Sequence, residues 1–133
     1  MALQYSVAVN NARLDAIETT IGATAILRIR TGAQPATCAT ADAGTVLATL
    51  TLPADWMSAA AAGAKAKLGT WQDTSADATG TAAHFRIYDS AGTVCGMQGS
   101  YGVSATDMIG DSVSFTAGQS FTINSFTLTA ANT

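Results

Sequence analysis

The chain has 133 residues, which is enough for one compact domain with its own core and too few for two, so we expect a single domain over residues 1–133. Only 11% of the residues are charged, the formal net charge is −3, and just six residues are Lys or Arg. This composition excludes the basic patch that nucleic-acid binding needs, and no apolar run approaches the ~20 residues of a membrane span. Residues 1–10 lack the features of a signal peptide, so we expect the protein to be made in the cytosol.

The low content of charged residues also bears on how easily another protein can cover the surface. Thr, Ser and Gln must supply much of the polar surface, and such a surface loses little hydration when a neighbour covers it. We interpret this as a sign of contacts in an oligomer or assembly; the alternative is an Ala- and Thr-rich monomer.

Residues 5–21 form the best helix candidate. Leu14, Ile17 and Ile21 fall on one apolar stripe, which Val7 and Asn10 would continue towards the start. A second stripe is predicted to face solvent; it consists of Asn11, Asp15 and Glu18. Ser6 is a candidate N-cap, and Gly22 is placed to end the helix in a left-handed turn. The helix could pack across an open end of a β domain or dock on a partner subunit.

Two strands follow the helix. Residues 24–30 alternate, with Leu27 and Ile29 inward and Arg28 and Arg30 on the other side. Residues 45–52 form the second strand. Its inward side chains are predicted to be Val46, Ala48, Leu50 and Leu52. Residues 35–44 between the two strands are small and polar, and we expect a surface loop there.

Residues 54–71 are the least regular part of the pattern. Residues 54–63 are rich in alanine but lie between Pro53 and Gly63, so we predict extended chain or a single turn. Residues 64–71 are predicted to form an edge strand, with Lys65 and Lys67 outward to discourage the addition of another sheet. Residues 72–79 form a polar connection.

The clearest hairpin spans residues 80–97. Phe85 and Ile87 alternate with His84, Arg86 and Tyr88 on the first strand. The turn at residues 89–92 begins with Asp and ends with Gly, as a type I turn prefers, and residues 94–97 return. Residues 99–105 are predicted to be a flexible crossing.

The remaining strands are short, except for the last. We predict strands at residues 107–109, 112–116 and 121–130, with a turn at residues 117–119. In the last strand Phe121 and Ile123 are odd-numbered whereas Phe126 and Leu128 are even-numbered, so a β-bulge near residues 124–125 is needed to keep all four inward. We therefore predict a mainly β fold: a jelly roll or β-sandwich of about eight short strands preceded by one α-helix. The predicted shared core consists of Leu27, Ile29, Leu50, Phe85, Ile87, Phe115, Ile123, Phe126 and Leu128.

No catalytic, cofactor-binding or metal-binding residue set emerges from the sequence. His84 is the single histidine, which excludes a two-histidine metal site, and we expect it to be structural rather than part of a Ser–His–Asp triad. Asp73, Ser75 and Asp77 resemble the start of a calcium loop, but Ala78 and His84 stand where that loop requires Gly and Glu. We therefore expect no enzyme activity, no cofactor and no metal.

Two further groups of residues allow more than one interpretation. Four aromatic residues could line a sugar site, although core or interface packing is the commoner role: Trp56, Trp71, Tyr88 and Tyr101. Cys38 and Cys95 are a single pair far apart in the sequence, and we favour two free thiols over a disulfide bridge.

Several short motifs occur along nearly the whole chain. They are the opening Met1-Ala2-Leu3, the helix end Leu14-Asp15-Ala16-Ile17, Leu27-Arg28-Ile29-Arg30-Thr31-Gly32, Gln34-Pro35-Ala36, Leu47-Ala48-Thr49-Leu50-Thr51-Leu52, Asp77-Ala78-Thr79-Gly80-Thr81-Ala82-Ala83-His84-Phe85-Arg86-Ile87, and Ala117-Gly118-Gln119 before a closing Thr/Asn strand. Together they resemble a family of small virion structural proteins of tailed phages and prophages. Residues 59–67 depart from the family pattern.

The resemblance implies a jelly-roll or sandwich protein of the virion, such as a capsid cement or decoration subunit. Its expected partners are the major capsid protein and copies of itself, and its expected location is the virion. The alternatives are a tail or neck structural subunit and a module that binds carbohydrate or the host surface.

Overall fold

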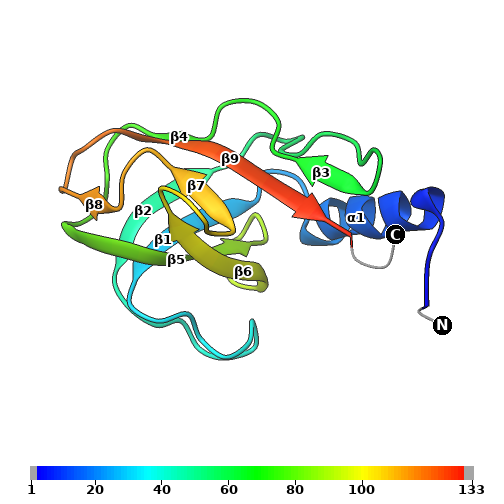
Figure 1. Cartoon of the computed structure of the whole chain (residues 1–133). Coiled ribbons are helices and arrows are strands. Elements are labelled where there is room, and N and C mark those ends of the chain that lie inside the picture. The colour runs from blue at the N-terminus through cyan, green and yellow to red at the C-terminus, as the bar shows by residue number, and fades with distance from the viewer. Residues whose placement is uncertain (1–2, 131–133) are drawn as a thin grey trace.

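The computed structural model describes residues 3–130, which form one helix and nine strands (Figure 1). The elements are α1 (Val7–Ile21), β1 (Ile26–Thr31), β2 (Val46–Thr51), β3 (Ala64–Ala66), β4 (Gln72–Asp73), β5 (Gly80–Tyr88), β6 (Cys95–Gly102), β7 (Met108–Gly110), β8 (Ser114–Phe115) and β9 (Phe121–Thr129). The prediction of a mainly β fold preceded by one helix is confirmed, and the curled sheet is consistent with the sandwich or jelly-roll class.

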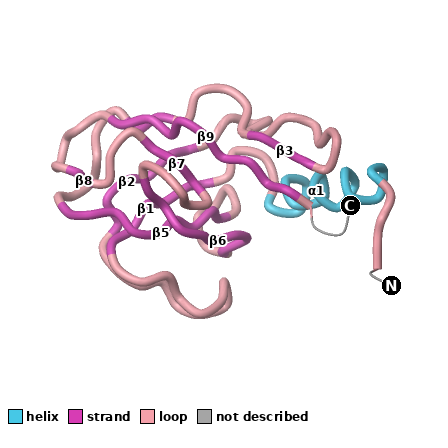
Figure 2. Tube along the Cα trace, viewed as in Figure 1, coloured by secondary structure: helices cyan, strands magenta, loops and turns pink. Residues whose placement is uncertain are grey.

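The strands run in the order β2-β1-β5-β6-β7-β9-β3, with β4 paired to β9 and β8 paired to β5. The β6–β7 pair is parallel, with Tyr101 opposite Met108, and the other pairs are antiparallel. The strands curl around the core, while the long loop between β1 and β2 lies below β1, β5 and β6 in Figure 2. We call residues 32–45 the β1–β2 loop.

The predicted hairpin is confirmed as β5 and β6, at the centre of the sheet. The Gly92 amide donates to the Asp89 carbonyl over 2.9 Å, and Gly92 has φ 71°, as the expected turn requires. The prediction of a flexible crossing at residues 99–105 is wrong for its first half, because β6 continues to Gly102. Gly99 lies beneath the Phe85 ring, where a Cβ would come within 2.7 Å of Cε1. This glycine therefore allows close packing within a strand.

Two bulges set which side chains reach the core. In β9, Ile123 pairs with Gly110 and Ser125 with Ile109, so Asn124 is the extra residue and the predicted bulge is confirmed. In β2 the register shifts between Ala48 and Val46, which lets Leu47 become fully buried as well. The predicted inward row of β2 missed Leu47 for this reason.

The core contains eight of the nine predicted residues, and Leu128 packs against it partly buried. A chain of ring contacts runs through its centre: Trp56 to Trp71 at 6.1 Å, Trp71 to Phe126 at 5.8 Å, and Phe126 to Phe85 at 5.4 Å between centroids. Residues 54–63 form no helix, as predicted, and they contribute Trp56 and Met57 to the core.

Helix α1 occupies the predicted range to within two residues. Ser6 Oγ accepts from the Val9 amide over 3.2 Å, which confirms the N-cap. Gly22 follows the helix with φ 100° and ψ 170°, a positive-φ conformation more extended than the left-handed turn predicted for it. Leu14 and Asn10 are buried, but Val7 is 53% exposed, so the apolar stripe does not reach the start of the helix.

The polar stripe of α1 does not simply face solvent, contrary to the prediction. Asn11 Oδ1 accepts from the Gly63 amide, Asp15 Oδ1 accepts from the Ala60 amide, and Glu18 Oε2 accepts from the Met57 amide. Residues 57–63 lie outside the named strands, so their backbone N–H groups need other partners. The helix therefore docks on this segment through its polar side chains.

Lys65 completes this contact and corrects a second prediction. β3 is an edge strand as predicted, although it covers only Ala64–Ala66 of the predicted residues 64–71. Lys65 points inward, not outward, with only 3% of its side chain exposed. Its Nζ lies 2.8 Å from Asp15 Oδ1, 3.5 Å from Glu18 Oε1 and 2.9 Å from the Ser58 carbonyl oxygen. The hydrogen bond from Lys65, followed by that from the Ala60 amide, lowers the pKa of Asp15.

Replacing Lys65 by Met keeps the apolar stem and removes the ammonium group. We expect Lys65→Met to lower the free energy of unfolding by about 1–3 kcal/mol, because charged hydrogen bonds are lost and the Ser58 carbonyl loses a partner. Lys67→Met is the matched control on the same segment and should have a smaller effect. Urea denaturation measures both; equal effects would show that the ammonium of Lys65 contributes nothing special.

Candidate interaction surface

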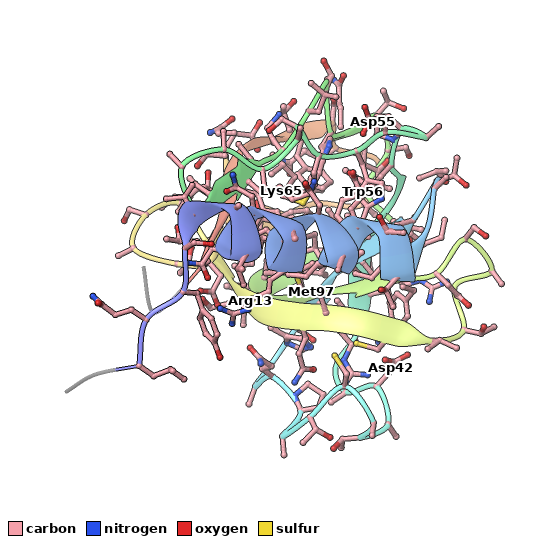
Figure 3. All side chains as sticks on the ribbon, turned by 90° about the vertical axis from the view of Figure 1, so that its right-hand side faces the viewer. Arg13, Asp42, Asp55, Trp56, Lys65 and Met97 are labelled. Atoms are coloured by element: carbon pink, nitrogen blue, oxygen red, sulfur yellow. The ribbon has the colours of Figure 1, made fainter. Side chains whose placement is uncertain are left out.

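A groove separates α1 from the start of β6. Its volume is about 580 Å³, and its lining comes from one face of α1 and from the β5–β6 hairpin: Arg13, Ala16, Ile17, Thr20, Ile21, Asp89, Val94, Cys95 and Gly96. In Figure 3 the helix lies across the front of the molecule with β6 directly below it, and Met97 is labelled between them. A Cβ on Gly96 would lie 2.5 Å from Ile21 Cγ1, so this glycine sets how closely helix and strand approach.

One exposed apolar side chain lines this groove, and others lie at residues that precede the groove-lining part of α1. Val94, which lines the groove, is 63% exposed. Near the start of α1 four more apolar or aromatic side chains are exposed: Leu3, Tyr5, Val7 and Val9. The Arg13 guanidinium lies 5.0 Å from the centre of the Tyr5 ring, so the segment before the helix is held against it. We call α1, its preceding residues 3–6 and the groove the α1 face.

A buried polar cluster lies on the other side of the hairpin. Arg86 Nη1 is 2.7 Å from Asp42 Oδ1, and Arg30 Nη2 is 2.9 Å from Asp42 Oδ2. The Tyr88 hydroxyl donates to Asp42 Oδ1 over 2.7 Å. Arg30, Arg86 and Tyr88 are at most 6% exposed, so two nearly buried guanidinium groups share one carboxylate as their counter-charge.

Arg86 also binds the backbone of the β1–β2 loop. Its Nη2 donates to the Thr37 and Thr40 carbonyl oxygens over 2.9 and 3.0 Å. Its Nε donates to Gln98 Oε1, and Gln98 Nε2 donates in turn to the Pro35 carbonyl oxygen over 2.8 Å. The loop is therefore fixed over the outward row of β5.

These contacts shift the ionisation of the cluster. Burial alone would raise the pKa of Asp42, but the hydrogen bonds from Tyr88 and Arg86 and the charges of Arg30 and Arg86 outweigh it, so the pKa lies below its usual value. Burial, assisted by the hydrogen bond to Asp42, raises the pKa of Tyr88. The carboxylate and the phenol are thus held in the ionisation states that bind each other.

His84 is 1% exposed, and its Nδ1 lies 2.8 Å from the Gly32 carbonyl oxygen, where a proton on Nδ1 is donated to that oxygen. Its Nε2 is buried without a hydrogen-bond partner. The ring thus supports the first residue of the β1–β2 loop, as the structural interpretation of His84 expects.

Asp73 and Asp77, in the segment that resembles a calcium loop, form hydrogen bonds to strand β2. Asp73 Oδ1 accepts from the Ser75 amide over 2.9 Å, and Asp73 Oδ2 accepts from the Thr49 amide over 3.3 Å. Asp77 Oδ2 accepts from Thr49 Oγ1 over 2.8 Å. Within residues 3–130 the structure brings together no group of three His, Cys, Asp or Glu side chains suited to a metal.

The four aromatic residues considered for a sugar site are all buried. Trp56 and Trp71 are at most 1% exposed, and their indole N–H groups donate to the Gly22 and Leu68 carbonyl oxygens. Tyr88 is in the polar cluster, and Tyr101 donates to the Ser112 carbonyl oxygen over 2.7 Å while packing on Phe115. They serve the core and do not form an open stacking platform.

Sequence reasoning missed both the groove and the polar cluster. The alternation in β1 and β5 did place Arg30, Arg86 and Tyr88 on one side of neighbouring strands, which is a usable signal for a shared partner. Asp42 lies in a small polar loop that gives no periodic pattern, so nothing in the sequence pointed to it as that partner.

Comparison with models of protein families, with curated protein sequences and with solved structures gives no match for this chain. In the part of the chain that the structure describes, α1 is too short and too polar to cross a membrane.

The lowered pKa of Asp42 predicts a pH dependence of stability. A carboxylate whose folded pKa lies below its unfolded value stabilises the fold above the unfolded pKa, whose reference value is 3.8, and loses this contribution as the pH falls through the folded pKa. Asp42→Asn should therefore lose less stability than wild type on acidification below that pH. Thermal melts from neutral pH to acid measure this; parallel curves for the two proteins would contradict it.

Proposed function

We propose that this chain is a structural subunit of a bacteriophage virion, and specifically a capsid cement or decoration subunit that stabilises the head shell. The observation that carries the proposal is the α1 face: Leu3, Tyr5, Val7 and Val9 are exposed near the start of the helix, and Val94 is exposed in the groove of about 580 Å³. Apolar side chains gathered in this way are typical of surfaces that bind other proteins. The resemblance of the sequence motifs to small virion proteins supplies the kind of assembly.

The charge distribution supports the same proposal. Only 11% of the residues are charged, and several of these are used inside the fold, notably Lys65, Arg30 and Arg86. The outer surface therefore carries few ions whose hydration would be lost in a contact. On a repeating lattice, many such weak contacts act together and raise the effective concentration of each subunit at its site. The proposed partners are the major capsid protein and further copies of this chain.

Two other candidate functions have less structural support. A tail or neck subunit would use the same kind of surface and differs in copy number and location. A module that binds carbohydrate would use exposed aromatic side chains, but the four considered for this role are buried. Among the remaining aromatic residues, Tyr5 is 37% exposed and is covered on one side by Arg13. We propose no enzymatic role and no cofactor.

The assembly proposal is tested by counting copies in purified particles. We expect hundreds of copies per particle by gel densitometry, and particles stripped of the protein should burst at a lower temperature than intact ones. Attachment should depend only weakly on salt, because few charges take part. About six or twelve copies, the symmetry expected of a neck, tail or vertex, would contradict the cement role.

The contribution of the α1 face has its own test within that assay. The variant Val7→Asp should bind back to stripped particles at least tenfold more weakly, because a charged group would then have to be desolvated. Val103→Asp is the matched control, since Val103 is 53% exposed, as Val7 is, but lies between β6 and β7. Equal losses for both would show that the α1 face has no special role.

A further inference from the structure

Cys38 and Cys95 lie side by side although 57 positions separate them in the sequence. Their Sγ atoms are 2.9 Å apart, and both residues are free cysteines. Cys95 begins β6 opposite Tyr88, and Cys38 lies in the β1–β2 loop. A cavity of about 260 Å³ opens beside them, lined by both cysteines together with Asp42, Arg86, Tyr88 and Thr93, among others. Both residues are partly exposed, and the cavity that they line gives a small reagent a route to them.

The pair is held in position by its surroundings. Arg86 binds the Thr37 and Thr40 carbonyl oxygens, which lie on either side of Cys38 in the chain. Cys95 is fixed by its place in the β5–β6 pairing and by a contact from its Sγ to the Met97 carbonyl oxygen over 3.5 Å. The sulfur atoms need to approach each other by less than about 1 Å to reach the bonding distance of a disulfide.

We propose that Cys38 and Cys95 are an oxidation site that forms an intramolecular disulfide and covalently locks the β1–β2 loop onto β6. The oxidant is a small-molecule or protein disulfide. This inference goes beyond the proposed function and does not depend on it.

The reaction is two successive thiol–disulfide exchanges. Burial, with the hydrogen bond to Cys38 as a second cause, raises the pKa of Cys95 to about 12, so the first attack falls to Cys38. The Cys38 thiolate bonds to one sulfur of the oxidant and releases the other as a thiolate. Cys95 then gives up its proton, and its thiolate attacks Cys38 Sγ; the bond from Cys38 to the oxidant breaks, and the second released thiolate takes up the proton. In total, two cysteine thiols lose two electrons and two protons, and one external disulfide becomes two thiols.

The lock should stabilise the fold without changing it. A crosslink between residues 57 positions apart restricts the unfolded chain strongly, and the native atoms need only a small shift. For a domain of this size the expected rise in melting temperature is ~10 °C.

The test uses the full-length protein, first reduced and then exposed to oxidised glutathione under native conditions. We expect peptide mapping to find Cys38 joined to Cys95 within one chain, no titratable thiol to remain, and the melting temperature to rise and fall back on reduction. Stable glutathione adducts on either cysteine, disulfide-linked dimers, or a Cys38–Cys95 bond that forms only in denaturant would each overturn the proposal.

Two variants test whether the disulfide depends on the position of Cys38. Cys38→Ser should show no rise in melting temperature under the same oxidant, because Cys95 then has no partner. Cys38→Ser combined with Ala39→Cys carries the same number of thiols, displaced by one position in the loop. If this displaced thiol links to Cys95 as readily as Cys38 does, the loop does not hold a specific geometry and the inference fails. The wild-type measurement stands without either variant.

Discussion

The hydrogen bonds of the Arg86 guanidinium group hold the β1–β2 loop against the sheet, and the rest of that side of the molecule depends on them. A charge that is 98% buried is tolerated only when hydrogen bonds and a counter-charge replace the lost water. Arg86 obtains these from Asp42, from two carbonyl oxygens of the β1–β2 loop and from Gln98. Because most of these partners belong to one loop, satisfying the arginine also folds the loop onto the sheet. The position of Cys38 next to Cys95 follows from this arrangement.

At the α1 end of the structure, polar side chains again fix an irregular segment, but here the backbone donates the hydrogen bonds and the side chains accept them. There an irregular backbone segment needs acceptors, and three side chains of α1 provide them, while Lys65 forms ion pairs with two of these side chains. A chain with so few charged residues thus uses a large share of them to fix irregular segments to regular ones. The consequence is a surface even poorer in ions than the composition suggests, next to a groove between α1 and the start of β6.

Much of the fold could be predicted because it is set by local patterns. The β5–β6 hairpin follows from alternation and a turn of known chemistry, and the bulge at Asn124 follows from a change of phase between Ile123 and Phe126. The inward side of β3 could not be predicted, because Lys65 is stabilised by Asp15, 50 positions earlier in the chain. Asp42 and Arg86 are 44 positions apart, and no periodic pattern links them. The groove could not be predicted from the sequence either, because it forms only when α1 lies against β6.

The central claim is that Arg86 fixes the β1–β2 loop. Amide hydrogen exchange tests it most directly in Arg86→Met, with Arg28→Met as the control, because Arg28 is on the neighbouring strand and bonds instead to the Gly92 carbonyl. The Thr40 amide, which donates to the Thr37 carbonyl that Arg86 binds, is the reporter, and the Thr45 amide, bonded to Thr31, is the internal reference.

Loss of a charged hydrogen-bond donor should speed exchange at Thr40 by about tenfold or more in Arg86→Met, with little change at Thr45 and no change in Arg28→Met. Unchanged exchange at Thr40 in Arg86→Met would contradict the account.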